Sequence, residues 1–182
     1  MSALKSGRIM LRALELEDLE DIQRIRSEYE NNKLYAGFPF PVSRINEKYW
    51  LKSLYSTFSR NRIDYAIVLR RSQRMVGMIG IRDIDALHRR GQYSIIIEKA
   101  ARGKGYGRES SSLLLDHAFG DLNLNRIQLL VLKDNSDAIV LYSKLGFRKE
   151  GELRDYFFQD SRYKKMVIMG LLSRDWLKMK GR

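Results

Sequence analysis

The segment that most restricts the fold is a strand-like run that passes through three glycines directly into a helix-like run. Gln92–Ile97 is a predicted apolar strand, and Gly105–Leu122 has the pattern of a helix. Between them Gly103, Gly105 and Gly107 alternate with other residues. Glycine lets the backbone adopt positive φ and approach a ligand closely, and free N–H groups at a helix start favour a phosphate. We therefore expect a strand, loop and helix that together hold a phosphate or pyrophosphate.

Two well-known phosphate-binding patterns do not fit this loop. Arg108 stands where a dinucleotide-binding G-x-G-x-x-G pattern has its third glycine. Gly103-Lys104 is followed by Gly105, and the first glycine of a P-loop is missing. Arg102 and Lys104 add positive charge that suits an anion. A tight strand-to-helix turn without a ligand remains an alternative interpretation of the glycines alone.

A second motif lies one predicted strand later, on the following helix. At about 100° per residue, Asn135, Ala138 and Tyr142 share one helical face. Leu141 and Leu145 lie on another face and are free for the core. Taken alone, this pattern also fits a capping asparagine and a packed tyrosine. The glycine loop upstream favours the interpretation that the polar edge lines a ligand site.

The periodicity along the 182 residues predicts one domain, residues 1–182, with an α/β fold. Short polar turns between the central strands favour antiparallel pairing, so we expect a mixed, mostly antiparallel sheet with helices on both faces. Asn31–Val42 contains both prolines of the chain and is expected to be irregular. The expected order is β-α-α-β-β-β-α-β-α-β-β, with strands Ile9–Leu14, Tyr65–Leu69, Met75–Ile84, Gln92–Ile97, Arg126–Leu132, Phe147–Phe158 and Tyr163–Leu172, and helices Leu16–Tyr29, Ile45–Phe58, Gly105–Leu122 and Asn135–Lys144.

The composition excludes several kinds of site. The chain has no cysteine, which removes disulfides, thiolate nucleophiles and cysteine-based zinc sites. His88 and His117 are its only two histidines, so no metal site is expected. Apolar runs are far shorter than the ~20 residues that a membrane helix needs, and the first residues lack the apolar region of a secretory signal. We therefore expect a cytoplasmic protein that does not bind a membrane.

The charge balance favours an anionic partner without selecting it. Lysine and arginine number 34 against 22 aspartates and glutamates, which gives a net charge of +12. Such a field attracts nucleic acid, acidic membrane or a polyphosphate ligand. The basic residues are dispersed along the chain, whereas a nucleic-acid-binding module would show clustered lysine and arginine with aromatic platforms. Nucleic acid is therefore not the expected partner.

The two motifs together resemble a known family. Arg102-x-x-Gly105-x-Gly107 followed by Asn135-x-x-Ala138-x-x-Leu141-Tyr142-x-Lys144-x-Gly146-Phe147 resembles the GNAT N-acetyltransferases. The resemblance spans nearly the whole chain and is closest to the branch of spermidine and ribosomal-protein N-terminal acetyltransferases. His88-Arg89-Arg90 and Glu150-Gly151-x-Leu153 are features shared with that branch.

The resemblance implies a binding mode for acetyl-CoA. In that family the cosubstrate lies in a V-shaped gap between two strands, here Gln92–Ile97 and Arg126–Leu132. Part of the basic excess would then meet the polyanionic CoA. The resemblance implies that the pantetheine amides pair with backbone groups of Ile95, Ile96 and Ile97, and that the pantetheine arm lies near Asn135. It implies that the adenosine phosphates lie near Lys144. The pyrophosphate would be held by Arg102, Gly103, Lys104, Gly105, Tyr106 and Gly107.

The chemistry of acetyl transfer gives Tyr142 a role. An amine with a pKa near ~10.4 must lose a proton before it attacks the thioester, and the departing thiolate, whose conjugate acid has a pKa near ~8.5, must gain one. A tyrosine with a pKa near ~10 is a suitable donor, and positioned acids typically contribute ~10²–10⁴-fold. By this chemistry and by the resemblance, Tyr142 is predicted to be the general acid. Direct attack of the amine needs no covalent enzyme intermediate, which suits a chain without cysteine.

The sequence leaves the general base open. Many relatives have a glutamate at the start of the fourth strand, where this chain has Gln92, and an amide cannot accept the proton. Glu98 is a candidate, although a carboxylate in a loop is usually solvated. His88 falls in a predicted turn at the surface, and His117 falls mid-helix and is expected to pack. A water bound to the backbone is the remaining alternative.

Acceptor specificity is expected in Asn31–Lys48 and in the hairpin near Phe157–Tyr163. Spermidine acetyltransferases are acidic in the first stretch, whereas this chain is nearly free of carboxylates there, which argues against a polyamine acceptor. A protein N-terminus, an amino sugar or another small amine remain open. Five aromatic residues are candidates for the acceptor pocket or for core and lid packing: Tyr35, Phe38, Phe40, Tyr49 and Trp50.

The predicted function is an acetyl-CoA-dependent N-acetyltransferase that moves an acetyl group directly to a primary amine. Its partners would be acetyl-CoA and the amine acceptor, and relatives suggest a homodimer. The alternatives are an acetyl-CoA-binding sensor without turnover, which the change to Gln92 keeps open, and a basic nucleic-acid-binding module.

Overall fold

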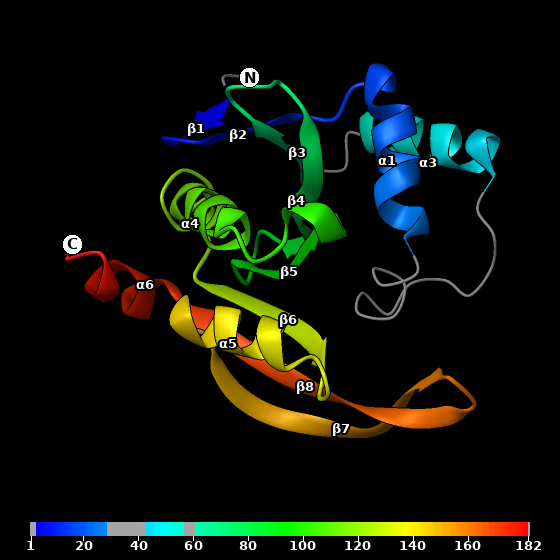
Figure 1. Cartoon of the computed structure of the whole chain (residues 1–182). Helices are drawn as coiled ribbons and strands as arrows, with labels where there is room; N and C mark the ends of the chain where they lie inside the picture. Colours follow the sequence, from blue (N-terminus) through cyan, green and yellow to red (C-terminus); the bar gives the residue numbers. More distant parts are fainter. Residues whose placement is uncertain (1–2, 29–42, 57–60, 182) are drawn as a thin grey trace.

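One eight-stranded sheet runs through the described part of the molecule in the order β1-β2-β3-β4-β5-β6-β8-β7 (Figure 1). The structure is a computed structural model and describes residues 3–28, 43–56 and 61–181. Neighbouring strands are antiparallel except for β5 and β6, which are parallel. The strands are β1 (Leu4–Lys5), β2 (Ile9–Ala13), β3 (Ile63–Leu69), β4 (Met75–Asp85), β5 (Arg90–Ile97), β6 (Arg126–Leu132), β7 (Arg148–Gln159) and β8 (Arg162–Leu172).

Helices cover both faces of the sheet, as Figure 1 shows for α1 and α3 on one side and α4 on the other. Side chains alternate along the strands, so β3 buries Ile67 in one apolar cluster and Ala66 and Val68 in another. The first cluster includes Leu114 of α4, and the second includes Leu51 of α3. The helical segments are η1 (Leu16–Asp18), α1 (Leu19–Ser27), α3 (Arg44–Ser56), η2 (Lys99–Ala101), α4 (Tyr106–Phe119), α5 (Ser136–Lys144) and α6 (Ser173–Met179).

The predicted α/β fold with a mixed, mostly antiparallel sheet is confirmed. The prediction of one continuous helix from Leu16 was wrong, because a 3₁₀ turn precedes α1. The Asp18 carboxylate caps the start of that turn, since it accepts the Glu15 N–H (2.8 Å) and hydrogen bonds from both terminal nitrogens of Arg12. Strand β1 and helix α6 were not predicted. Two residues are too few to show a strand period, and α6 directly follows the apolar strand β8.

Part of the predicted acceptor region lies outside the described residues. This applies to residues 29–42, and therefore to Tyr35, Phe38 and Phe40. Of the predicted helix Ile45–Phe58, the part to Ser56 is observed within α3. In the described part of the chain, no helix combines the length and apolar character needed to cross a membrane.

The sheet divides between β5 and β6. These two strands pair only at Arg90–Arg126, Gly91–Ile127 and Gln92–Gln128. Beyond Gln92 no residue of β5 is registered against β6, although both strands continue. The carboxyl-terminal halves of β5 and β6 therefore part, and the chain between them passes through η2 and α4 (Figure 1).

Candidate active site

Main-chain groups of β5 face the region where the two strands part. The Arg89 carbonyl oxygen accepts from the Asn125 N–H (2.6 Å) on the β6 side, and the Glu98 N–H donates to Val76 (2.9 Å) on the β4 side. Backbone direction alternates along a strand, so odd-numbered residues of β5 point toward β6. Ile95 and Ile97 thus direct their N–H and C=O groups into the gap. Ile96 directs its groups toward β4.

The glycine loop has the expected left-handed conformation. Gly103 and Gly105 have φ of +73° and +82°. Gly105 is the N-cap of α4, and the first helical hydrogen bond runs from the Glu109 N–H to the Gly105 carbonyl oxygen (3.1 Å). The N–H groups of Tyr106 to Arg108 precede this bond, and no side chain of the described residues caps the helix at Gly105. The start of α4 therefore presents main-chain donors suited to an anion.

The loop lies against both β5 and α5. A Cβ added to Gly107 would lie 3.3 Å from Ile97 Cδ1 and 3.4 Å from Leu141 Cδ2. The neighbour of Leu141 on α5 is Tyr142. The two motifs, more than 25 residues apart in the sequence, therefore meet at one place in the fold.

The turn between β1 and β2 supports the loop through a brace of Ser6 and Arg8 on Glu109, which the sequence did not predict. The Arg8 guanidinium donates to the Lys104 carbonyl oxygen (3.0 Å) and to Glu109 Oε2 (2.8 Å). Arg8 also lies over the Tyr106 ring, with Cζ 5.1 Å from its centroid. Ser6 Oγ donates to the other oxygen of Glu109. About 100 residues separate Arg8 from Glu109, so no local spacing could have revealed the contact.

This brace keeps Glu109 ionised. Desolvation acts to raise the pKa of Glu109, but the hydrogen bonds from Ser6 and Arg8 outweigh it and lower that pKa below its ordinary value. The carboxylate lies in the first turn of α4, where negative charge is favourable. Glu109 and Arg8 therefore stay paired at neutral pH, and the loop remains tied to the turn before β2.

Tyr142 is buried on α5 within an aromatic cluster. Its side chain is packed edge-on against Tyr93 of β5 (centroids 5.8 Å apart, planes at 82°) and against Phe147 (5.9 Å). The Tyr93 hydroxyl is in turn 2.6 Å from Ser111 Oγ on α4. Tyr93 of β5 and Phe147, just before β7, therefore fix the orientation of the Tyr142 ring beside the part of β5 that no longer pairs with β6, and α4 in turn contacts Tyr93.

The remaining predicted cosubstrate residues differ in their surroundings. Asn135 is the N-cap of α5, and its Oδ1 accepts from the Ala138 N–H (3.2 Å). This oxygen serves the helix, which leaves the amide nitrogen for other contacts. Lys144 is exposed at the end of α5, Lys104 is exposed in the loop, and Arg102 donates from Nε to the Ile97 carbonyl oxygen (3.1 Å).

Glu98 is not the solvated loop carboxylate that was expected. Its side chain is 1% exposed and is held by Arg24 and Arg74. Arg74 donates a hydrogen bond of 2.8 Å to Oε2 of Glu98. The other terminal nitrogen of Arg74 lies 2.7 Å from Oε1, which is an ion-pair distance, but the two atoms are not aligned for a hydrogen bond. A proton taken up by Glu98 would disrupt these buried pairs, which argues against its use as the base.

One histidine is exposed and the other is packed, as predicted. His88 is exposed, with Nδ1 2.8 Å from Asp85 Oδ2. The His117 side chain is 10% exposed, is 2.7 Å from Asp121, and packs edge-on against Tyr65. No group of three or more metal-ligating side chains occurs among the described residues.

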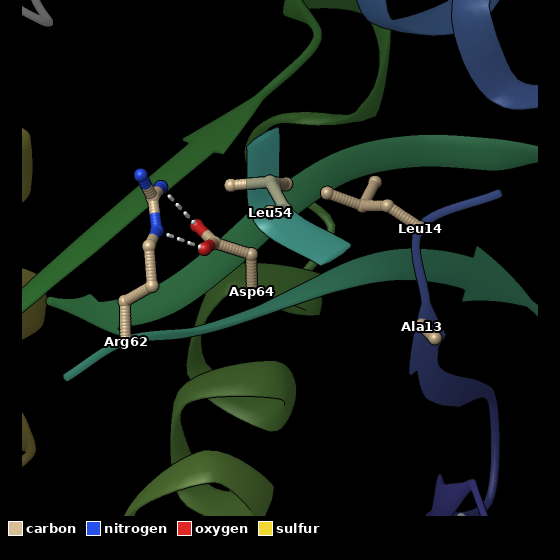
Figure 2. Close-up of a pocket in the computed structure, with 5 residues that line it drawn as sticks. All are labelled: Ala13, Leu14, Leu54, Arg62 and Asp64. Atoms are coloured by element: carbon tan, nitrogen blue, oxygen red, sulfur yellow. Dashed lines mark hydrogen bonds and ion pairs between the residues drawn. The ribbon is translucent and has the colours of Figure 1, made fainter. Parts of the chain in front are cut away.

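A small hollow on the α3 side of the sheet is separate from this site. Figure 2 shows that Arg62 and Asp64 point toward each other at its edge, joined by two hydrogen bonds of 2.7 and 3.0 Å. Both charges are thereby satisfied within the protein. Its lining residues are Ala13, Leu14, Leu54, Arg62 and Asp64, none of which belongs to the glycine loop or α5.

Comparisons with known proteins identify the family of the chain. The family model described as the acetyltransferase (GNAT) domain matches residues 8–148. The chain belongs to the GNAT acetyltransferase family. The GNAT resemblance of the two motifs is thereby confirmed.

Several GNAT relatives are named for their acceptors. The chain is 31% identical to the spermidine N(1)-acetyltransferase of Escherichia coli (strain K12) over 171 residues, which cover 93% of this chain and 88% of that protein. It is 28% identical to the putative ribosomal N-acetyltransferase YdaF of Bacillus subtilis over 102 residues, 56% of each chain. The solved structure of the Vibrio cholerae spermidine N-acetyltransferase with CoA and spermine has a TM-score of 0.88 and 27% identity and covers 94% of this chain and 99% of that one.

These findings establish the general activity of this GNAT protein. It is an acetyl-CoA-dependent N-acetyltransferase that acts on amines. Acetyl-CoA is its cosubstrate, as predicted.

Proposed function

We propose that Tyr142 protonates the departing CoA sulfur while the acetyl group moves directly to a primary amine. The observation that carries this proposal is the place of Tyr142, whose ring is fixed against Tyr93 on the unpaired part of β5. Its neighbour Leu141 lies next to Gly107 of the glycine loop. A thioester held along β5, with its phosphates at the loop, would bring its sulfur near this phenol.

In this proposal acetyl-CoA is held mainly by main-chain groups. Ile95 and Ile97 would pair with the pantetheine amides as an added strand does, while Ile96 supports the strand through its buried side chain. The pyrophosphate would lie on the amides from Gly103 to Gly107, with charge from Arg102 and Lys104. The Asn135 amide would face the pantetheine arm, and Lys144 the adenosine phosphates.

The chemical step has a simple balance. The neutral amine nitrogen attacks the thioester carbonyl, a C–N bond forms and the C–S bond breaks. The sulfur takes the Tyr142 proton and leaves as the thiol, the nitrogen loses one proton to a base and then to solvent, and the Tyr142 phenolate regains a proton from solvent. Gln92 cannot serve as that base, and Glu98 is held by two arginines. We therefore assign the amine proton to a water bound at backbone groups of the gap.

The proposal also includes the domain extent, the cellular location and the oligomeric state of the enzyme. The resemblance to relatives supports one N-acetyltransferase domain over residues 1–182, a cytoplasmic location and a homodimer. Light scattering after size-exclusion chromatography would measure the oligomeric state directly, and a monomeric mass would remove the dimer from the proposal.

A thiol-release assay across a panel of amines tests the role of Tyr142. We expect Tyr142→Phe to lower kcat by about 10²–10⁴-fold, with the KM for acetyl-CoA changed less than about twofold, because only the proton donor is lost. Tyr65→Phe is the matched control, since it removes a hydroxyl from another buried tyrosine of the same core. A Tyr142→Phe enzyme with the wild-type kcat would contradict the assignment.

A further inference from the structure

A basic hollow lies where β6 ends, beside the β7–β8 hairpin. It has a volume of about 350 Å³. One wall is the turn that follows β6, and the other is the start of β8, joined by a hydrogen bond from the Lys133 N–H to the Lys165 carbonyl oxygen (3.0 Å). The residues that line it are Lys133, Asp134, Arg162, Tyr163, Lys164 and Lys165.

The single carboxylate among the lining residues is neutralised. Lys164 is only 11% exposed, and its Nζ lies 3.1 Å from Asp134 and 3.9 Å from Asp160. Lys133 is also paired, with its Nζ 3.1 Å from Glu152. Hydrogen bonds from Lys149 and Lys133 lower the pKa of Glu152 to about 2, so this partner remains ionised.

Arg162 and Lys165 are the cations that remain. Both side chains belong to exposed residues, and no carboxylate of the described residues lies within ion-pair distance of either one. Tyr163 adds an exposed aromatic ring, which packs at 5.1 Å from Phe158. The hollow thus combines two available positive charges with an aromatic wall, a combination that favours an anionic organic group.

The hollow adjoins the end of the proposed acetyl-transfer gap. Lys133 is the first residue after β6. The edge of β6 that faces β5 is unpaired from Leu129 onward. Asn135, two residues later, caps α5, the helix that carries Tyr142. The remaining atoms of a molecule with its anion in the hollow can therefore extend to the mouth of the gap.

Three carboxylates on the other side of β5 are already occupied. Glu47 of α3 is 2% exposed and lies 3.0 Å from Arg26. Glu98 is enclosed by two arginines, and Glu28 accepts the Lys99 N–H (2.8 Å). A polycation bound by these groups would have to displace existing partners. These three carboxylates are therefore poorly suited to bind a polyamine, whereas the hollow offers two cations to an anion.

We infer that this hollow binds an anionic group of the acceptor, so that the acceptor is a primary amine that also carries a carboxylate or phosphate. The inference rests on the proposed function, because it places the amine in the gap beside Tyr142. An acidic peptide and a small phosphorylated or carboxylated amine share this chemistry, and the acceptor panel distinguishes them.

The test compares acceptors that differ only in the anion. One pair is a short peptide with a free N-terminus followed by two aspartates, against the same peptide with asparagines. A second pair is an amino sugar with and without a phosphate ester, and spermidine is a further arm. We expect kcat/KM to be about tenfold or more higher for the anionic member of at least one pair, the range of one charge-assisted hydrogen bond.

A charge reversal assigns the preference to the hollow. We expect Arg162→Glu/Lys165→Glu to abolish or reverse the preference, with the KM for acetyl-CoA changed less than about twofold. The matched control is Arg174→Glu/Lys178→Glu, which changes net charge equally at exposed positions of α6. These lie beyond the opposite end of β8, an 11-residue strand of roughly 33 Å. The control should keep the wild-type preference.

Two results would overturn the inference. One is a wild-type enzyme that treats both members of each pair alike or prefers spermidine. The other is a reversal variant that retains the preference for the anion. Either result leaves the proposed function intact as long as thiol release depends on Tyr142, whereas absence of thiol release with every amine would count against the proposed function itself.

Discussion

The two edges of β6 have different partners and different uses. Along one edge, all seven residues of β6 are registered against β8 in antiparallel pairing. Along the other edge, only its first three residues are registered against β5. One edge of β6 therefore holds the sheet together. Along its other edge, main-chain groups of β5 are left without a strand partner.

This difference explains how a sheet can provide a binding surface. Paired strands lie about 4.8 Å apart, which leaves no room for a ligand between them. Where β5 and β6 part, Ile95 and Ile97 still direct backbone groups outward. The aromatic contact of Tyr142 with Tyr93 fixes α5 beside that opening. Stability of the sheet and binding by the gap should then respond to different substitutions.

A substitution on the paired edge should affect stability most. Met169 of β8 is registered opposite Leu129 of β6 and is 1% exposed. We expect Met169→Ala to reduce the free energy of unfolding by about 2–5 kcal/mol, because it leaves a cavity in the core. The KM for acetyl-CoA at a permissive temperature should stay within about twofold. Chemical denaturation and steady-state kinetics measure the two quantities, and a large KM change would show that the two edges are coupled.

A substitution in the glycine loop should instead affect the KM for acetyl-CoA. Gly105 has φ of +82°, and an added Cβ would lie 3.2 Å from Arg8 Nη2. A left-handed conformation costs an L-residue about 1–2 kcal/mol of free energy. We therefore expect Gly105→Ala to raise the KM for acetyl-CoA by about tenfold with little change in kcat, because the amides of the loop lose their alignment. Gly181→Ala, at a left-handed glycine outside the site (φ +71°), should not change the KM. An unchanged KM in Gly105→Ala would separate the loop from cosubstrate binding.

The smallest expected effect is on the free energy of unfolding. It concerns the ion pair of Glu109 with Arg8, which supports the loop, and it depends on pH. The folded pKa of Glu109 is below its ordinary value of 4.5, so its ionised form stabilises the fold above that value. This contribution declines as the pH falls through the lower folded pKa. At pH 7 we expect Glu109→Gln to be less stable than wild type by about 1 kcal/mol, and the two unfolding free energies should converge at acidic pH.

Urea unfolding between neutral and acidic pH measures this effect. Glu17→Gln, at an exposed residue of η1, is the control and should run parallel to wild type across the range. A difference between Glu109→Gln and wild type that stays constant with pH would contradict the assigned role of the ion pair with Arg8.

The local elements near the site were largely predictable from the sequence. The glycine loop, the start of α4 and the face shared by Ala138 and Tyr142 follow from backbone freedom and helical geometry. Their bounds differ from expectation by one or a few residues at most ends. The 3₁₀ turn before α1 was missed because it depends on Arg12, a residue of the preceding strand.

Contacts between distant residues were not predictable. Arg8 and Glu109 meet across about 100 positions, and Glu98 is enclosed by arginines from α1 and from the turn before β4. The sequence suggested a solvated Glu98, because a carboxylate in a loop usually reaches water. Burial reversed that expectation, and only the packing of α1 on the sheet produces it.

By itself, the order of residues determined where strands, helices and the glycine loop occur, and which residues could carry acetyl transfer. These properties depend on side-chain periodicity and backbone freedom, which act over a few residues. The tertiary structure alone decided that β5 and β6 part after three pairs, that Arg8 supports the loop, and that Arg162 and Lys165 lack carboxylate partners among the described residues. Those features arise from contacts between segments that folding brings together, and no local pattern encodes them.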